Sequence, residues 1–243
     1  MRDGRQFTGV TIGGKTGETE NTPPRGYPNF ITLEGRKRVA RGSECAVFRH
    51  PERDDVLVKV RDFRRMDEHR GPLNAFWLRR SEGYRLRWLR RQFDGYLQLH
   101  HREEPPEAPF PLAHIHGFAM TDLGPAFLME KIARPNGDLA PTYRRLQKQG
   151  NLGAAQIEAL NGFVRSALAW NLPMTDLNPT NIVFGHRGGT AECVMIDGFG
   201  DYSTLHLRSL FPRLNRPIAL RKFRMLAGML DLTWDAKALA FRA

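Results

Sequence analysis

Two short apolar segments joined by a glycine-rich turn constrain the fold of this chain more than any other feature. The segments 181–184 (NIVF) and 193–196 (CVMI) are rich in residues that favour β-strands, and the intervening GHRGGT carries the glycines of a tight turn. The pattern predicts a β-hairpin. The polar loop TDLNPT leads into the first strand and Asp197 follows the second, so acidic residues stand at both ends of the hairpin.

Strand patterns elsewhere predict that the hairpin belongs to a mixed α+β protein. Alternation in 56–60 (VLVKV) predicts a strand with valines on one face and Leu57 and Lys59 on the other. Further strands are predicted within 36–51, 113–120 and 125–132.

Two helices are predicted between these strands and the hairpin. An arginine-rich segment from about 72 to 100 forms the first, with candidate buried positions at Leu78, Leu86, Leu89 and Phe93. The clearest helix covers 154–171, where apolar residues recur at helical spacing: Ile157, Leu160, Val164, Ala167 and Leu168. The C-terminal end is predicted to be helical and basic.

The charge balance of the 243-residue chain narrows the choice of partners. Lys and Arg number 37 against 26 for Asp and Glu, which gives a net charge of +11. Such an excess favours an acidic partner: a nucleotide, a nucleic acid, a phospholipid or lipopolysaccharide. Two cysteines, Cys45 and Cys193, are too few for a disulfide framework or a metal-ligand cluster, which fits a reducing cytoplasm.

The sequence predicts neither a transmembrane segment nor a secretory signal. No apolar run approaches the roughly 20 residues that cross a bilayer. The N-terminal stretch lacks an apolar core, and its content of Gly, Thr and Pro predicts a flexible tail.

Asp176, Asn181 and Asp197 make up the set that a phosphoryl-transfer site requires. An Asp must orient the acceptor hydroxyl and accept its proton, while an Asn and a second Asp hold Mg²⁺ against the phosphates. Mg²⁺ prefers oxygen ligands and takes one or two carboxylates together with phosphate oxygens. The alternative is an ordinary turn, in which Asp176 caps the loop, Pro179 fixes it and Asn181 ends it.

These motifs resemble those of the protein-kinase-like superfamily. DLNPTN resembles the catalytic loop DLKPEN, and DGFG resembles the Mg²⁺-binding DFG with one inserted glycine. The resemblance implies that Asp176 is the catalytic base and that Asn181 and Asp197 hold Mg²⁺. VLVK resembles VAIK, which implies that Lys59 binds the phosphates of ATP.

The nucleotide side of the resemblance lies earlier in the chain. Glu82, on the arginine-rich helix, is implied as the partner of Lys59, with Glu68 as the alternative. VARGSECAV resembles the glycine-rich nucleotide loop, and FLMEKI resembles the hinge strand whose backbone contacts adenine. The residues implied to contact ATP are Val39, Gly42, Val47, Leu57, Lys59, Met129, Glu130 and Ile132.

More narrowly, four blocks together resemble the PhoP regulatory network YrbL family over about residues 33–225: RGSECAVFRHP, RRSEGY, DLNPTNIVF and VMIDGFGD. The resemblance implies a compact bilobal protein-kinase-like α+β fold with a truncated C-lobe. Its divisions would be a disordered tail at 1–28, an N-lobe of sheet and one helix at 29–133, and a helical C-lobe with the catalytic hairpin at 134–243.

Several positions depart from the kinase pattern. Ala40 and Cys45 replace two loop glycines, so the loop is expected to approach phosphates less closely. Met174 and Thr175 stand where HR would be, and Asn178 replaces the lysine that would meet the γ-phosphate. The absence of an APE motif removes the usual platform for a peptide substrate.

Three functions stay open at the level of sequence. The first is ATP·Mg²⁺-dependent phosphoryl transfer to a hydroxyl of a small molecule or glycan, whose own charge could be negative. The second is a pseudokinase that acts as a nucleotide-binding or regulatory scaffold. The third is a basic module that binds nucleic acid or an anionic membrane surface. The retained acidic and amide residues favour the first, the altered glycines and Asn178 the second, and the net charge the third.

Overall fold

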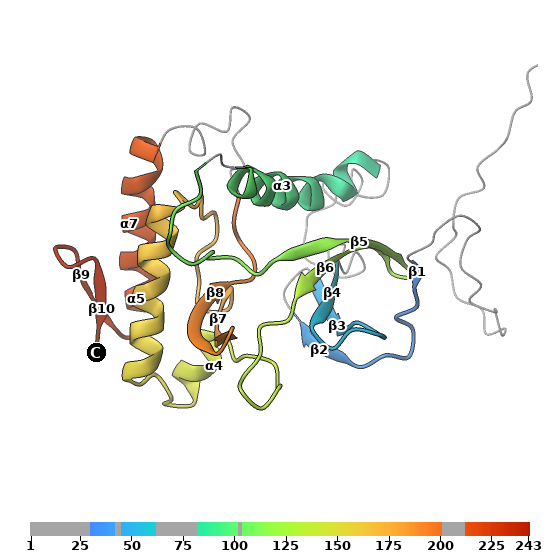
Figure 1. Ribbon diagram of the computed structural model, residues 1–243, viewed down its shortest axis with the longest axis horizontal. Helices are drawn as coiled ribbons and strands as arrows, with labels where there is room; N and C mark the ends of the chain where they lie inside the picture. The colour runs from blue at the N-terminus through green and yellow to red at the C-terminus, as the bar shows by residue number, and fades with distance from the viewer. Residues whose placement is uncertain (1–29, 42–44, 62–81, 102–103, 201–211) are drawn as a thin grey trace, which may run out of the picture.

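The computed structural model describes residues 30–41, 45–61, 82–101, 104–200 and 212–243. The predicted tail at 1–28 lies outside these ranges. The described residues form a β-sheet part followed by a largely helical part, and the two lie at opposite ends of the molecule (Figure 1). No helix in these ranges is long and apolar enough to cross a membrane.

A six-stranded sheet dominates the first part, with the strand order β1-β5-β6-β4-β3-β2. Neighbouring strands are antiparallel except β1 and β5, which are parallel. The strands are β1 (Phe30–Ile31), β2 (Arg38–Arg41), β3 (Cys45–Arg49), β4 (Val56–Arg61), β5 (Ile115–Thr121) and β6 (Gly124–Glu130). All but β1 fall where the sequence predicts strands.

Alternation along β4 separates the two faces of the sheet, as the sequence predicts. Val58 and Val60 are fully buried and join Phe48 in a small core on one face. The opposite face carries Leu57 and Lys59. On that face Lys59 is in register with Phe127 of β6, so both strands present side chains to the rest of the molecule.

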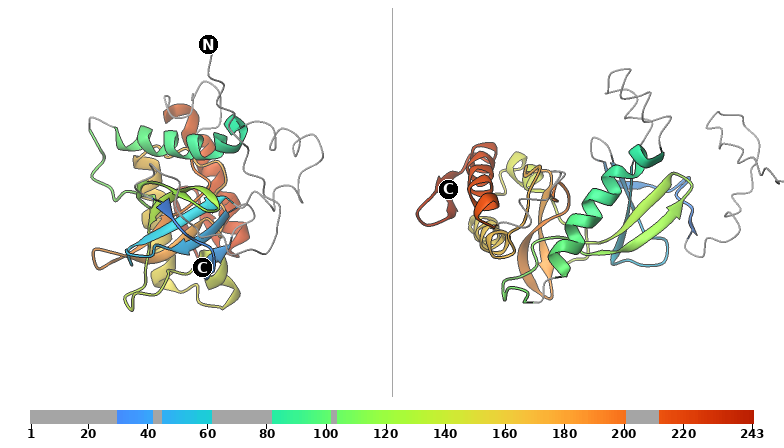
Figure 2. Two further views of the ribbon diagram at one scale, coloured as in Figure 1. Left: turned by 90° about the vertical axis from the view of Figure 1, so that its right-hand side faces the viewer. Right: turned by 90° about the horizontal axis from the view of Figure 1, so that it is seen from above.

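Helix α3 (Glu82–His100) lies across β5 and β6 on this second face (Figures 1 and 2). The Phe93 ring meets Phe118 edge-on at a centroid distance of 4.6 Å and lies 6.5 Å from Phe127. Aromatic contacts of this kind therefore fix the helix on these two strands. Strands β3 and β4 stay open on this face.

The buried stripe of α3 differs from the predicted one. Gln92, Tyr96 and Leu99 are buried at helical spacing, whereas Leu86 is 37% exposed. The expectation that Leu86 is buried is therefore wrong, because the inner face of the helix runs through Gln92 instead. Leu89 and Phe93 are partly buried against the core. Leu78 and the predicted beginning of the helix lie outside the described residues.

The second part contains helices packed around the predicted hairpin. Its elements are α4 (Tyr143–Lys148), α5 (Ala154–Ala169), β7 (Ile182–Arg187), β8 (Thr190–Met195), α7 (Pro212–Met229), β9 (Thr233–Asp235) and β10 (Ala240–Arg242). Gly188 and Gly189 join β7 to β8 with φ angles of 56° and 83°. Positive φ at both positions is the requirement of the tight turn that suits a hairpin.

One large core holds the second part together and continues under α3. Leu160, Val164 and Ala167 of α5 are buried in it, as their spacing predicts, together with Met195 of β8 and Phe223 of α7. The α+β fold class is therefore confirmed, with a sheet part followed by a largely helical part. The sequence did not predict α4 or the β9–β10 hairpin.

Arg187, at the tip of the hairpin, connects the two parts through a half-buried ion network. Its guanidinium donates to both carboxylate oxygens of Glu130, at 2.9 and 2.8 Å, and reaches Glu192 at 3.3 Å. It also donates to the carbonyls of Phe110 and Leu112, each at 2.9 Å. A planar guanidinium with several donors is suited to this number of acceptors.

The two carboxylates of this network respond differently to Arg187. Burial raises the pKa of Glu130, but the hydrogen bonds from Arg187 and the His114 N–H outweigh it, so the pKa ends below its ordinary value. Burial raises the pKa of Glu192, and the more distant contact with Arg187 does not offset this. The stabilisation from Glu130 is thus present above its ordinary pKa and is lost as the pH falls through the lower folded value.

We expect Arg187→Met to lower the free energy of unfolding by about 3 kcal/mol, because it leaves the Glu130 carboxylate buried without its cation. Arg165→Met is the matched control, since the Arg165–Glu158 pair has the same 2.8 Å distance but side chains 65% and 69% exposed. Its loss should be below about 1 kcal/mol. Urea unfolding of both variants measures the difference, and equal losses would contradict the assigned importance of the network.

Candidate active site

A cleft of about 660 Å³ lies between the open face of β3 and β4 and the loops around the hairpin. This volume is in the range of small-molecule sites. The sheet side contributes Ala40, Cys45, Val47, Leu57, Lys59, Arg61, Met129, Glu130 and Ile132. The opposite side contributes Thr142, Thr175, Asp176, Asn178, Thr180, Asn181, Ile196, Asp197 and Gly198.

The cleft face of β4 changes from apolar to cationic along the strand. Leu57 stands at one end, followed by Lys59 and then Arg61 at every second position. Both cations are buried, with Lys59 5% and Arg61 7% exposed. The Lys59 Nζ lies 2.8 Å from Asp197 Oδ2, which forms an ion pair across the cleft. The strand thus concentrates positive charge at the end where Asp197 stands.

One carbonyl oxygen joins the loop before the hairpin to the segment after it. The Gly198 carbonyl accepts hydrogen bonds from the backbone N–H groups of Thr175 and Asp176, each at 2.8 Å, and from Thr175 Oγ1 at 2.7 Å. Next to it, Met174 and Phe199 form a β-bridge. The two polar ends of the hairpin, far apart along the hairpin sequence, are therefore joined directly.

Gly198 can make this contact because it has no side chain. Its φ of +78° lies in the left-handed region, and a Cβ there would collide with the Asp176 carbonyl and lie 2.8 Å from Asn181 Nδ2. The glycine inserted into DGFG is thus required by the close approach of two backbone segments.

Asp176 is oriented by two amides. Asn181 Nδ2 donates to the Asp176 carbonyl at 2.9 Å and to its Oδ2 at 3.0 Å, and Asn178 Nδ2 donates to the same Oδ2 at 2.9 Å. Asn178 is itself held by Thr180, whose N–H donates to Asn178 Oδ1 at 2.8 Å. Within the described residues Oδ1 of Asp176 accepts no hydrogen bond. The exposed side chain therefore offers this oxygen to a hydroxyl in the cleft.

Asp197 is held by the backbone of the next residue and by a side chain of α3. The Gly198 N–H donates to its Oδ1 at 2.9 Å, and Gln92 Nε2 donates to the same oxygen at 3.3 Å. Helix α3 approaches closely here, because a Cβ built on Gly95 would lie 2.7 Å from the Gly200 Cα. The helix and the segment after β8 are thus in backbone contact beside the carboxylate.

The donor set of Asn181 and Asp197 fits a hard divalent cation. Asn181 uses its Nδ2 toward Asp176, which leaves its Oδ1 as an oxygen donor, and Asp197 supplies a carboxylate. The described residues contain no cluster of three His, Cys, Asp or Glu side chains suited to a metal. A cation held here would complete its shell with waters and with oxygens of a bound phosphate, which is the habit of Mg²⁺.

An apolar slot lies beside the cations. Val47, Leu57, Met129 and Ile132 line it, and the Ile132 N–H makes no backbone hydrogen bond within the described residues. Other backbone groups of residues 130–132 already bond within the protein. The Glu130 N–H donates to the His114 carbonyl at 2.8 Å, and the Ile132 carbonyl accepts from the Ala140 N–H at 3.0 Å. Few backbone groups of this segment are therefore left to bind a ligand.

Most of the residues predicted from sequence meet at this cleft. They are Val47, Leu57, Lys59, Met129, Glu130, Ile132, Asp176, Asn181 and Asp197. Val39 is not among the lining residues, because the register between β2 and β3 shifts there and Ala40 takes the position opposite Val47. Gly42 and the alternative Glu68 lie outside the described residues, and so does the side chain of Glu82. Their roles remain predictions.

Sequence reasoning missed three side chains of the site. Arg61 could have been found from the alternation that singled out Lys59, since it is the next residue on the same face. Gln92 gave no signal, because a polar residue in an arginine-rich helix is ordinarily solvated. Asn178 was noted only as a lost lysine, whereas the structure gives it a bond to Asp176.

A family model matches most of the chain. The model of the family described as PhoP regulatory network protein YrbL matches residues 31–230, so the chain belongs to that family. No curated protein matches the chain. Among solved structures, Rad53 1–466 in complex with AMP-PNP is similar with a TM-score of 0.44 and 15% identity. The match covers 84% of this chain and 50% of that one.

We expect Gly198→Ala to destabilise the protein by about 3 kcal/mol, because it adds a steric collision to the cost of a left-handed alanine. Gly188→Ala is the matched control. Its φ is +56° but no atom lies within 4 Å of the added Cβ, so it should cost only about 1 kcal/mol. Urea unfolding of the two variants separates strain from collision. Equal losses would show that the loop moves to make room for the added methyl group, and would contradict the predicted collision.

Proposed function

We propose that this protein binds ATP with Mg²⁺ in the cleft and transfers a phosphoryl group to a hydroxyl of a small molecule or glycan. The observation that carries this proposal is the meeting of two pairs, Lys59 with Asp197 and Asp176 with Asn181, in one cleft. Phosphoryl transfer depends on positioning and on charge stabilisation, for which these groups are the expected parts. The corresponding division is an N-lobe at 29–133 and a C-lobe at 134–243.

The proposed roles follow the change from apolar to cationic side chains along the cleft face of β4. The apolar slot near Leu57 and Met129 would take the base, with the Ile132 N–H as a donor to its edge. Lys59 and Arg61 would hold the phosphates. Asn181 and Asp197 would hold Mg²⁺, which when bound neutralises charge on the phosphate oxygens.

Asp176 would act on the acceptor. Its Oδ2 is occupied by two amides, and its Oδ1 would accept the proton of the acceptor hydroxyl as the hydroxyl oxygen bonds to the γ-phosphorus. The bond between that phosphorus and the β,γ-bridging oxygen breaks, and ADP leaves. The neutral Asn178 orients the base here, so the cationic role of the missing lysine would fall to another residue.

Arg61 is the candidate for that cationic role. It is buried, lines the cleft and lies on the same strand face as Lys59. Its β3 neighbour in the sheet register is Cys45, one of the residues that replace loop glycines. A guanidinium beside a loop with fewer glycines would supply phosphate contacts that the loop backbone provides less well.

A second candidate function is nucleotide binding without transfer. The observation that favours it is the 2.8 Å ion pair between Lys59 and Asp197, because the same carboxylate would have to serve both the lysine and the metal. Binding and turnover must therefore be measured separately.

Asp197→Asn and Asp176→Ala separate these steps. We expect Asp197→Asn to weaken Mg²⁺-dependent ATP binding about tenfold or more, since it removes the anionic metal ligand. Asp176→Ala should leave ATP affinity unchanged and lower transfer on the order of a hundredfold. Calorimetry measures the affinity, and formation of ADP from ATP, with water or added polyols as acceptors, measures the transfer. Binding without any ADP formation in the wild type would favour the scaffold, and no binding at millimolar MgATP would overturn the proposal.

Arg61→Gln tests the proposed phosphate contact. We expect it to weaken ATP binding about tenfold while leaving the affinity for adenosine unchanged, because only the phosphates meet Arg61. Arg49→Gln is the control with the same charge change, at the exposed end of β3. Equal weakening of ATP and adenosine by Arg61→Gln would show that Arg61 only supports the fold of the cleft.

A further inference from the structure

We propose that the outer face of α7 binds the surface of an anionic phospholipid bilayer. We define this face by Arg213, Leu214, Arg221, Arg224 and Met225, all of which are exposed. It lies in the helical part, where α5 and α7 run side by side at the end of the molecule away from the sheet (Figures 1 and 2). It is separate from the cleft and independent of the proposed phosphoryl transfer.

The charge of α7 is entirely positive. Its sequence, PRLNRPIALRKFRMLAGM, contains arginines and one lysine but no acidic residue. Lys222 is turned inward and donates to the Thr175 carbonyl at 2.7 Å. The four arginines are exposed, and none of them makes a side-chain hydrogen bond or ion pair with another residue of the described ranges. The helix therefore carries uncompensated charge on its outer side, which suits an anionic surface.

Large apolar side chains lie among these arginines. Leu214 is 51% exposed and Met225 is 53% exposed. Spacings of seven and eleven residues from Leu214 place Arg221 and Met225 along one line of the helix. The opposite side is packed in the core through Phe223 and Leu226, so no rotation of α7 can hide Leu214 and Met225.

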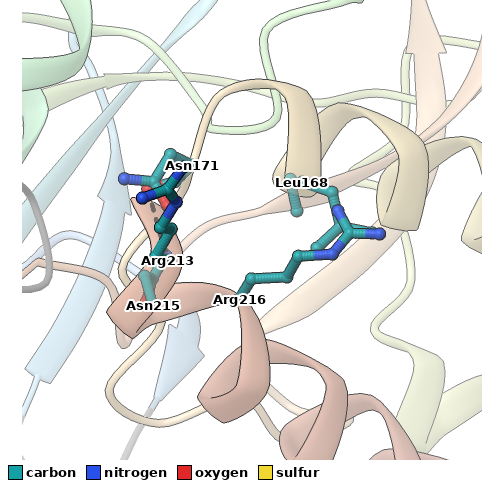
Figure 3. Close-up of a pocket in the computed structure, with 6 residues that line it drawn as sticks. Leu168, Asn171, Arg213, Asn215 and Arg216 are labelled. Carbon is teal, nitrogen blue, oxygen red and sulfur yellow. Dashed lines mark hydrogen bonds between the residues drawn. The ribbon is translucent and has the colours of Figure 1, made fainter. Parts of the chain in front are cut away.

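A hollow of about 160 Å³ lies between α5 and the N-terminal end of α7 (Figure 3). Arg213 and Arg216 border it, together with Leu168 and Asn171. Arg216 stands seven residues before the buried Phe223 and therefore lies on the side of α7 that turns toward the core. The base of the hollow is fixed because Asn215 Nδ2 donates to Asn171 Oδ1 at 3.0 Å and to the Leu172 carbonyl at 3.0 Å. The outer face therefore ends at Arg213, and the hollow is not part of it.

The apolar side chains favour lipid over nucleic acid as the partner. The phosphates of a nucleic acid would contact only the arginines of this face and leave Leu214 and Met225 unused. Single-stranded nucleic acids also bind through aromatic side chains, which this face lacks. A bilayer surface uses both features, since arginines attract anionic headgroups while Leu and Met enter the interface. The helix would lie along the surface.

The test is co-sedimentation of the full chain with vesicles of phosphatidylcholine containing about 30 mol% phosphatidylglycerol, whose anionic headgroups attract basic side chains. We expect binding to these vesicles, little to pure phosphatidylcholine, and weaker binding at higher salt. Arg221→Gln/Arg224→Gln and Leu214→Ser/Met225→Ser should each weaken partitioning about tenfold. Arg49→Gln/Arg145→Gln, with the same charge change on exposed arginines elsewhere, should retain it.

Three outcomes would overturn the proposal. The first is no vesicle binding by the wild type at low salt. The second is equal weakening by both arginine pairs, which would make net charge the cause. The third is retention of lipid binding by the Leu214→Ser/Met225→Ser variant together with salt-dependent binding of duplex DNA through α7, which would make nucleic acid the partner. Circular dichroism melting confirms that each variant is folded.

Discussion

The carbonyl oxygen of Gly198 is the point on which the arrangement of the cleft depends. It accepts hydrogen bonds from Thr175 and Asp176 and so joins the polar loop before the hairpin to the segment after it. This junction fixes the polar end of the loop, while Leu177 anchors the loop in the core. A backbone group shared by three donors also resists displacement, since moving it leaves several donors unsatisfied at once.

Helix α3 contacts the segment after the hairpin from the opposite direction. Its aromatic residues pack on the sheet, while Gln92 and Gly95 touch the segment that carries Asp197. A change in the position of α3 would therefore be transmitted both to the sheet and to the carboxylate that pairs with Lys59. The contact between Lys59 and Asp197 therefore depends on the relative positions of β4, α3 and the segment after β8.

The sequence predicted the fold class and most strands because these depend on local patterns, whereas the resemblance to the kinase-like superfamily implied most residues of the cleft. Alternation identified the cleft face of β4, and the paired glycines identified the turn at Gly188. What it could not predict depends on distant contacts. Leu86 is exposed because the inner face of α3 is set by its fit to β5 and β6. Arg187 looked like an ordinary turn arginine, and only the fold brings it to Glu130.

The Arg187 network also determines how the two parts can move relative to each other. It attaches the hairpin tip to the end of β6, and the bond from the His186 N–H to the Ala133 carbonyl at 2.8 Å lies beside it. This edge of the cleft is therefore tied firmly, and a rotation that opened the cleft would pivot about it. Such a rotation displaces Lys59 and Arg61 far more than Met129 or Ile132. A ligand would enter from the cationic end while the apolar slot keeps its shape.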